Sequence, residues 1–143
     1  MKFWDTSAVV PLCVQEPLSA TVREILVEDP AMVVWWGTRT ECISALMRQV
    51  REGNLAPADE RAARHVLYAL MQTWIEMQPG EALRSMAERL LAVHPLRTAD
   101  AFQLAAAILW CQGPTTGQSL VSLDRRLCDV GYREGFNVLP KAF

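Results

Sequence analysis

Short apolar runs alternate along the chain with longer segments in which apolar residues recur every three or four positions. Met32–Trp36 is rich in β-branched and aromatic residues, which is typical of a buried strand. Ser19–Glu28 instead carries Val22, Ile25 and Leu26, which line one stripe of a helix. Repeated alternation of this kind predicts an α/β fold, with a short parallel β-sheet flanked by helices on both faces.

Turn residues separate the predicted elements. Gly53 follows one helix at the C′ position, and Pro57 opens the next at its first residue. Trp74–Met77 could extend that next helix, but Pro79-Gly80 follow it and favour a short strand. The predicted strands are Lys2–Trp4, Met32–Trp36, Trp74–Met77, Leu120–Leu123 and Asn137–Leu139. The predicted helices are Ser7–Val14, Ser19–Glu28, Thr38–Arg51, Pro57–Met71, Glu81–Val93, Thr98–Cys111 and Arg125–Val130.

Residues 1–143 contain no linker, repeat or low-complexity tract, so we expect a single domain. Hydrophobic residues make up 51% and charged residues 21%, which is globular composition. The longest apolar run, Leu104–Cys111, is far shorter than the roughly 20 residues that span a bilayer, so we expect no membrane segment. The four cysteines form no CxxC pair and the two histidines lack zinc spacing, which favours small buried thiols in a cytoplasmic protein.

Four acidic residues follow predicted strands or open the helices that come next. They are Asp5, Glu41, Asp100 and Asp124. In a parallel sheet, the carboxyl ends of strands and the starts of the following helices face the same edge, where ligands bind. Each acid alone also fits a structural role, because an acid in the first turn of a helix offsets its dipole.

Helix capping accounts for part of this pattern. Asp5 is expected to cap the helix beside it, and Thr38, Thr98 and Ser122 are expected to cap three others. Thr38 and Glu41 also have the spacing of a capping box. Capping contributes only about 1 kcal/mol, so it does not by itself explain four acids at one edge.

Asp100 is the acid that capping explains least. It is the only charged residue between Arg97 and Asp124, and it opens a helix that is otherwise almost wholly apolar. A carboxylate entering a core is costly unless it is paired or bound to metal. Four convergent carboxylates would also repel one another unless divalent cations offset their charge. Oxygen-only ligands suit Mg²⁺ or Mn²⁺, which in such sites act on phosphates.

The charge of the whole chain does not favour a polyanionic substrate, but the charge around the predicted site does. The formal charge is −2, from 14 basic and 16 acidic residues, which argues against a general electrostatic grip on nucleic acid. Setting the four acids aside leaves 12 acidic residues against 14 basic ones. Arg39, Arg97, Arg125 and Arg126 flank the predicted site, where they would either contact substrate or pair with the acids.

These residues resemble the motifs of the PIN domain family and, more narrowly, of VapC-type toxins from VapBC toxin–antitoxin modules. The resemblance spans essentially the whole chain, with its motifs in the family's order and spacing. The matching segments are Phe3-Trp-Asp5-Thr-Ser-Ala-Val-Val, Glu41 at a helix start, Leu96-Arg-Thr-Ala-Asp100-Ala-Phe-Gln-Leu-Ala-Ala-Ala and Val121-Ser-Leu-Asp124-Arg-Arg-Leu. Two positions depart from the pattern: Gln103 stands where many relatives have His, and Ser122 where Thr is common.

The resemblance implies an endoribonuclease that depends on Mg²⁺ or Mn²⁺ and leaves 5′-phosphate and 3′-hydroxyl ends on the RNA. Asp5, Glu41 and Asp100 match the family's metal-binding acids. Asp124 matches a fourth acid, whose role varies among relatives.

The resemblance also implies further site residues and partners. Thr6 or Ser7 matches the hydroxyl position beside the first acid, so we expect Ser7 in catalysis and Thr6, Arg97 and Arg125 at the substrate. Family members are typically dimeric and are inhibited by a cognate antitoxin. We therefore expect a homodimer and a VapB-type antitoxin partner.

Two apolar features bear on this antitoxin. The helices of the first half carry more apolar residues than a lone core needs: Val22, Ile25, Leu26, Leu46, Met47, Val50, Leu67 and Leu70. Trp35 and Trp36 are adjacent, so either both are buried beneath helices on the two sheet faces, or one lies in a groove that receives an antitoxin helix or peptide.

Two other enzyme classes fit the sequence poorly, and one alternative that is not an enzyme remains. A haloacid-dehalogenase phosphatase needs Asp-x-Asp after the first strand, where Ser7 replaces the second Asp. A receiver domain needs a distal Lys, but the only lysines are Lys2 and Lys141. The remaining alternative is a catalytically silent PIN-fold module that binds RNA or protein.

Overall fold

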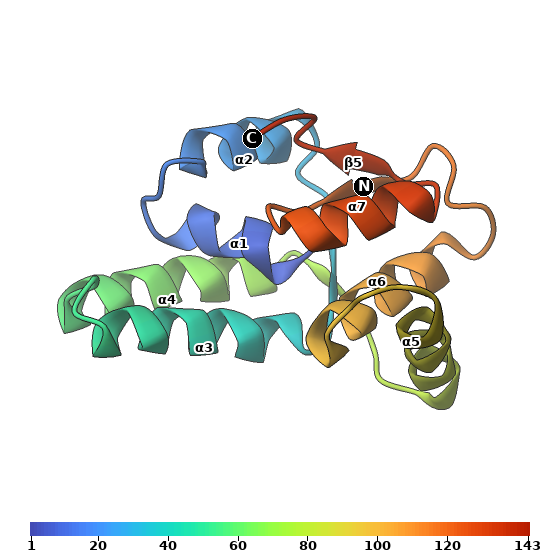
Figure 1. The fold of residues 1–143 in the computed structure, drawn as a ribbon. Helices are drawn as coiled ribbons and strands as arrows, with labels where there is room; N and C mark the ends of the chain where they lie inside the picture. The colour runs from blue at the N-terminus through green and yellow to red at the C-terminus, as the bar shows by residue number, and fades with distance from the viewer.

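Five short parallel strands form one sheet, in the order β3-β2-β1-β4-β5. The computed structural model describes residues 1–143 (Figure 1). The strands are β1 (Lys2–Trp4), β2 (Met32–Trp35), β3 (Ile75–Met77), β4 (Ser119–Val121) and β5 (Asn137–Leu139). The helices are α1 (Thr6–Cys13), α2 (Ser19–Glu28), α3 (Thr38–Arg51), α4 (Pro57–Met71), α5 (Glu81–Val93), α6 (Thr98–Cys111) and α7 (Arg125–Arg133). The predicted α/β fold is confirmed.

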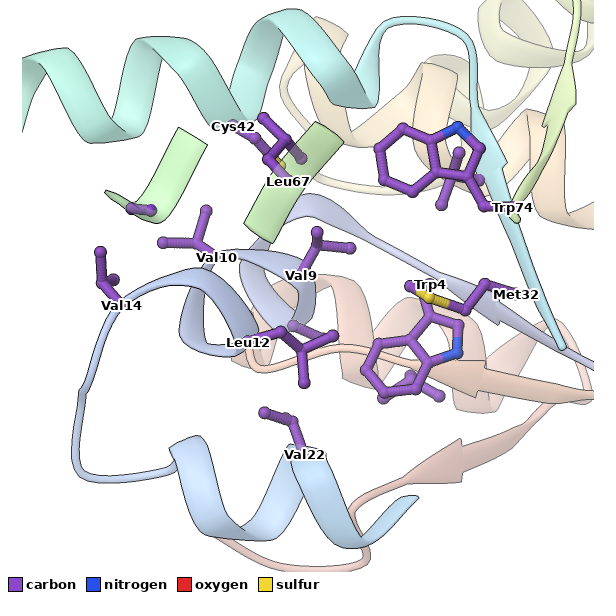
Figure 2. Packing of buried hydrophobic residues seen from close by; sticks show 14 of the residues in the cluster. Trp4, Val9, Val10, Leu12, Val14, Val22, Met32, Cys42, Leu67 and Trp74 are labelled. Atoms are coloured by element: carbon purple, nitrogen blue, oxygen red, sulfur yellow. The ribbon is translucent and has the colours of Figure 1, made fainter. Parts of the chain in front are cut away.

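Helices cover both faces of the sheet, because successive strand residues point to opposite sides. Trp4 and Val34 join an apolar cluster with α1–α4, whereas Phe3 and Val33 join a second cluster with α5–α7. Figure 2 shows the first cluster, in which Trp4 lies among side chains of the sheet and of α1 and α2. Full burial of each such large side chain contributes about 1.5–3 kcal/mol.

The central strand, β1, leads directly into the candidate site. Its aromatic residues Phe3 and Trp4 are fully buried, which anchors the strand between the two apolar clusters. The strand ends at Trp4, and Asp5 caps α1 by accepting a 2.7 Å hydrogen bond from the Ser7 amide. The expected Asp5 cap is therefore confirmed, and its carboxylate lies at the middle of the sheet's carboxyl edge.

The other expected caps are wrong. Helices α3 and α6 begin at Thr38 and Thr98 themselves, and neither helix has a side-chain cap. Thr38 is fully buried, and its hydroxyl accepts a hydrogen bond from Gln103 instead. Asp124, and not Ser122, caps α7 by accepting a 2.9 Å bond from a backbone amide of the first turn.

Some element boundaries differ from prediction where a backbone group finds another partner. Strand β4 ends at Val121 and not at Leu123, because the Leu123 amide donates to the Ser7 hydroxyl at 2.8 Å. Helix α7 continues to Arg133, three residues past the predicted end at Val130. Strand β3 begins one residue later than predicted, and β2 ends one residue earlier.

Trp35 and Trp36 lie in different environments. Trp35 is buried, and its ring stacks on Phe102 with centroids 5.5 Å apart, whereas Trp36 is 51% exposed. Of the two alternatives, burial of both tryptophans is wrong, because β2 ends at Trp35 and the chain turns there. Half of the apolar residues that were expected to exceed the needs of the core are in fact buried in it. These residues, all in the first cluster, are Val22, Ile25, Leu46 and Leu67.

No helix has the length and apolar character needed to cross a membrane. All four cysteines are free thiols, but only Cys42 is buried, so the prediction of four buried thiols is wrong for the other three. His94 has a structural role, with its Nε2 2.8 Å from a carboxylate oxygen of Glu134.

Candidate active site

Asp5 is the most deeply buried acid at the carboxyl edge of the sheet. Its carboxylate accepts hydrogen bonds from the Ser7 amide and the Ser7 hydroxyl, each at 2.7 Å, and from the Ser122 hydroxyl. Burial raises the pKa of Asp5; the bonds from Ser122 and Ser7 oppose this shift, and the nearby charge of Asp124 adds to it. These hydrogen bonds hold the carboxylate rigidly, but they offset only part of the cost of burying its negative charge.

Two serines connect the ends of β1 and β4. The Ser7 hydroxyl accepts from the Leu123 amide at 2.8 Å, and the Ser122 hydroxyl accepts from the Asp124 amide at 3.1 Å. The two hydroxyl oxygens lie 3.3 Å apart. This network sets the position of Asp124 relative to Asp5, although the two acids are far apart in the sequence.

Glu41 lies in the first turn of α3 and contacts Gln103 of α6. The Gln103 Nε2 atom donates to Glu41 Oε2 at 3.1 Å and to the hydroxyls of Thr6 and Thr38 at 3.0 Å each. Burial raises the pKa of Glu41 from 4.5 to about 7, and the charges of two other site acids add to the shift. The hydrogen bond from Gln103 therefore does not offset the cost of burying the ionised Glu41 carboxylate.

One hollow of about 350 Å³ brings together all of the predicted acids. Its wall contains the carboxyl end of β1 and the first turns of α3 and α6. It also contains Asp124, which follows β4 and caps α7. The predicted residues that line it are Asp5, Thr6, Ser7, Glu41, Asp100 and Asp124. The structure thus collects the four predicted acids and two hydroxyl residues from separate parts of the chain, and Glu16, which was not predicted, lines the same hollow.

The acids in this hollow repel one another, and none of the four predicted ones forms a salt bridge. Burial raises the pKa of Asp100, and the Asp124 charge adds to the rise. A backbone hydrogen bond from Arg97 and the charges of Arg126 and Arg97 oppose this rise only in part. No group of three or more His, Cys, Asp or Glu side chains is close enough together to hold a metal ion in this structure. An oxygen-only donor set with uncompensated charge fits Mg²⁺ or Mn²⁺.

A second hollow, of about 660 Å³, adjoins the acidic one and is mainly basic. The two share Arg48, Asp100 and Asp124. The residues that make the second hollow basic are Arg48, Arg97, Arg125 and Arg126. Helices α6 and α7 begin at its wall, and their amino-terminal dipoles favour anions there.

The arginines predicted to flank the acids are not equivalent. Arg97 and Arg125 line the basic hollow, as Arg126 does. Arg39 lines neither hollow, and its guanidinium lies over the Tyr68 ring, 5.8 Å from the centroid. The expectation that Arg39 flanks the site is wrong because the first turn of α3 directs it toward α4.

Sequence reasoning missed part of the site. Thr38 was expected to be a helix cap, and Arg48 had no signal that set it apart from other helix arginines. Gln103 did carry a signal, because it is the only amide in an otherwise apolar helix interior. Its contacts with Glu41 could not be predicted, since the two residues are 62 positions apart.

The family model of the PIN domain matches residues 2–132 of the chain. The chain belongs to the PIN domain family. A search of the curated proteins finds no match. Two solved structures of low sequence identity share the fold of this PIN domain.

The first is VapC20 of Mycobacterium tuberculosis, a toxin that cleaves the sarcin–ricin loop. It has a TM-score of 0.69 and 16% identity, with 92% of this chain and 95% of that chain covered. The second is PAE2754 of Pyrobaculum aerophilum, with a TM-score of 0.62, 20% identity and 93% of both chains covered. At these identities, the likeness establishes a common fold.

Proposed function

We propose that this PIN domain is a metal-dependent endoribonuclease of the VapC toxin type, which hydrolyses RNA phosphodiester bonds at the acidic hollow. One observation carries the proposal: Asp5, Glu41, Asp100 and Asp124 line a single hollow and have no salt-bridge partners. Carboxylates kept together at such electrostatic cost indicate a cation site. The fold likeness to VapC20, an RNA-loop-cleaving toxin, supports the choice of RNA and the toxin role.

In this proposal, Asp5, Glu41, Asp100 and Asp124 would hold Mg²⁺ or Mn²⁺. A cation bound there would offset the negative charge that develops on the phosphate and lower the pKa of a water molecule. Asp5 would serve as the rigid ligand, because three hydrogen bonds fix its carboxylate. The Ser7 hydroxyl lines the same hollow beside Asp5, where we propose that it orients the attacking water.

We propose that the basic hollow binds the RNA backbone on one side of the scissile bond. Arg97 and Arg125 would contact flanking phosphates, and Thr6 would contact substrate within the acidic hollow. Arg48 lines both hollows, so it is placed to contact the phosphate next to the one that is cleaved. Guanidinium groups suit this task because they donate to phosphate oxygens in a fork.

The same proposal includes the partners expected of a VapC-type toxin. The protein would act in the cytoplasm as a homodimer, with residues 1–143 as a single domain, and a VapB-type antitoxin would inhibit it. Trp36 supports an interface at the carboxyl edge of the sheet, because half-exposed aromatic residues commonly anchor protein partners. Light scattering should give twice the 16.0 kDa mass of the chain, and a monomer at micromolar concentration would contradict the dimer.

The nuclease proposal is tested by incubating purified, antitoxin-free protein with a mixed RNA pool in Mg²⁺ or in EDTA. Asp5→Asn and Asp100→Asn should abolish the cleavage seen in Mg²⁺. Glu88→Gln is the matched control, because Glu88 is an exposed acid on α5 that lines neither hollow. Cleavage that persists in EDTA or in both site variants would refute the proposal. A folded protein that binds Mn²⁺ but cleaves no RNA would favour the catalytically silent module.

A further inference from the structure

Gln103 joins three parts of the site from within the protein interior. It is only 2% exposed, although its side chain is polar. Its Nε2 atom lies 3.0–3.1 Å from the hydroxyls of Thr6 and Thr38 and from the carboxylate of Glu41, so its two hydrogens are shared among three acceptors. One amide of α6 therefore contacts the first residue of α1, the first residue of α3 and an acid one turn into α3.

The orientation of this amide follows from Glu41. An ionised carboxylate only accepts hydrogen bonds, so the amide nitrogen and not the oxygen must face it. The Gln103 Oε1 atom is then left buried without any partner. A buried carbonyl without a partner carries a desolvation penalty that an apolar side chain of the same size would avoid. The oxygen of this amide therefore adds nothing to fold stability, and what Gln103 supplies is the donor that faces Glu41 and the two threonine hydroxyls.

We infer that Gln103 is a positioning residue, which fixes the rotation of the Glu41 carboxylate so that it can bind a cation in the acidic hollow. The inference rests on the proposed function, because it assigns a task to Glu41 as a ligand. Glutamate has a flexible stem, and a donor locked by its own surroundings removes that freedom. The hydroxyls of Thr6 and Thr38 are those surroundings, since both hold the same Nε2 atom.

The test replaces Gln103 with methionine, which has a similar length and no donor. Mn²⁺ affinity is measured by calorimetry in the absence of RNA, and thermal stability is measured in EDTA. We expect Gln103→Met to bind Mn²⁺ about 10–100-fold more weakly while it still unfolds cooperatively in EDTA. In the cleavage assay, kcat should fall while the KM for RNA stays within about threefold of the wild-type value.

Leu104→Met is the matched control, because Leu104 is the next residue of α6, is fully buried in the second apolar cluster and lines neither hollow. It should keep wild-type Mn²⁺ affinity. Gln103→Asn is a second variant that keeps an amide but shortens the side chain by one methylene, so it should also weaken Mn²⁺ binding. It serves as the test if the methionine variant does not fold.

The outcomes separate the inference from the proposed function. If the wild type binds Mn²⁺ and both Gln103 variants bind it equally well, Gln103 has no positioning role, while the metal site stands. If the Gln103 variants lose stability and keep their Mn²⁺ affinity, the role of Gln103 is structural and the inference fails. If the wild type itself binds no Mn²⁺, the proposed function fails first and this inference falls with it.

Discussion

Replacing Asp5 with asparagine should stabilise the metal-free protein while it abolishes activity. The sign follows from electrostatics at the end of β1. Burial raises the pKa of Asp5 despite its bonds from Ser122 and Ser7, so the ionised form opposes folding at neutral pH. Asparagine removes the charge and keeps a similar shape.

The hydrogen bonds of this site survive the change only in part. The asparagine carbonyl still accepts from the Ser7 amide, as Asp5 Oδ1 does now. The asparagine amide would replace Oδ2, so the bonds that the Ser7 and Ser122 hydroxyls now donate to Oδ2 are lost and are replaced by bonds that these hydroxyls accept. Neutral bonds are weaker than charge-assisted ones, by about 0.5–1 kcal/mol each. Relief of a buried charge is worth several kcal/mol.

We therefore expect a net gain of about 1–2 kcal/mol at pH 7, in the range of stabilising active-site replacements. For a chain of this size, that raises the melting temperature by about 3–6 °C. Thermal and urea unfolding in EDTA measure it. The gain should shrink as the pH falls and should vanish below 3.8, where Asp5 is protonated in both the folded and the unfolded state.

Asp124→Asn is the matched control. Asparagine also caps helices well, and Asp124 is only partly buried, so its stability should change by less than about 0.5 kcal/mol. If Asp5→Asn instead lowers stability by 1 kcal/mol or more in EDTA, the hydrogen bonds outweigh the burial cost. In that case the argument that Asp5 is under electrostatic stress is wrong.

Three further predictions follow from other parts of the structure. In EDTA, the wild type should lose stability as the pH rises from 4.5 to about 7, because burial raises the Glu41 pKa. Glu41→Gln should flatten this part of the curve of stability against pH, and an unchanged slope would count against the raised pKa of Glu41. Gly131→Ala should lower stability by about 1–3 kcal/mol in chemical unfolding, since its Cβ would lie 2.6 Å from a side-chain carbon of the fully buried Leu120; wild-type stability would show that Leu120 can move aside. Mapping of cleaved RNA ends should find 5′-phosphates and 3′-hydroxyls, whereas a 2′,3′-cyclic phosphate would mean that the RNA's own hydroxyl attacks and not water.

Much of the fold follows from local patterns. Each helix and strand occupies nearly its predicted position, because stripes of apolar residues, strand-like runs and residues such as Pro57 act over a few positions. The site acids were also predictable as a group. Strand ends in a parallel sheet share one edge, so acids that follow them converge, and the isolation of Asp100 marked it as more than a surface charge.

The tertiary structure decided what surrounds those acids. The bonds that join Gln103 to Thr6, Thr38 and Glu41, and those that join Ser122 to Asp5, connect residues 62 to 117 positions apart. No local pattern encodes such contacts, because they depend on how α6 and β4 pack against the start of α1 and α3. The same holds for Arg48 at the boundary of the two hollows. The sequence by itself determined which chemical groups reach the edge of the sheet, whereas packing between distant elements determined how each group is oriented, solvated and paired.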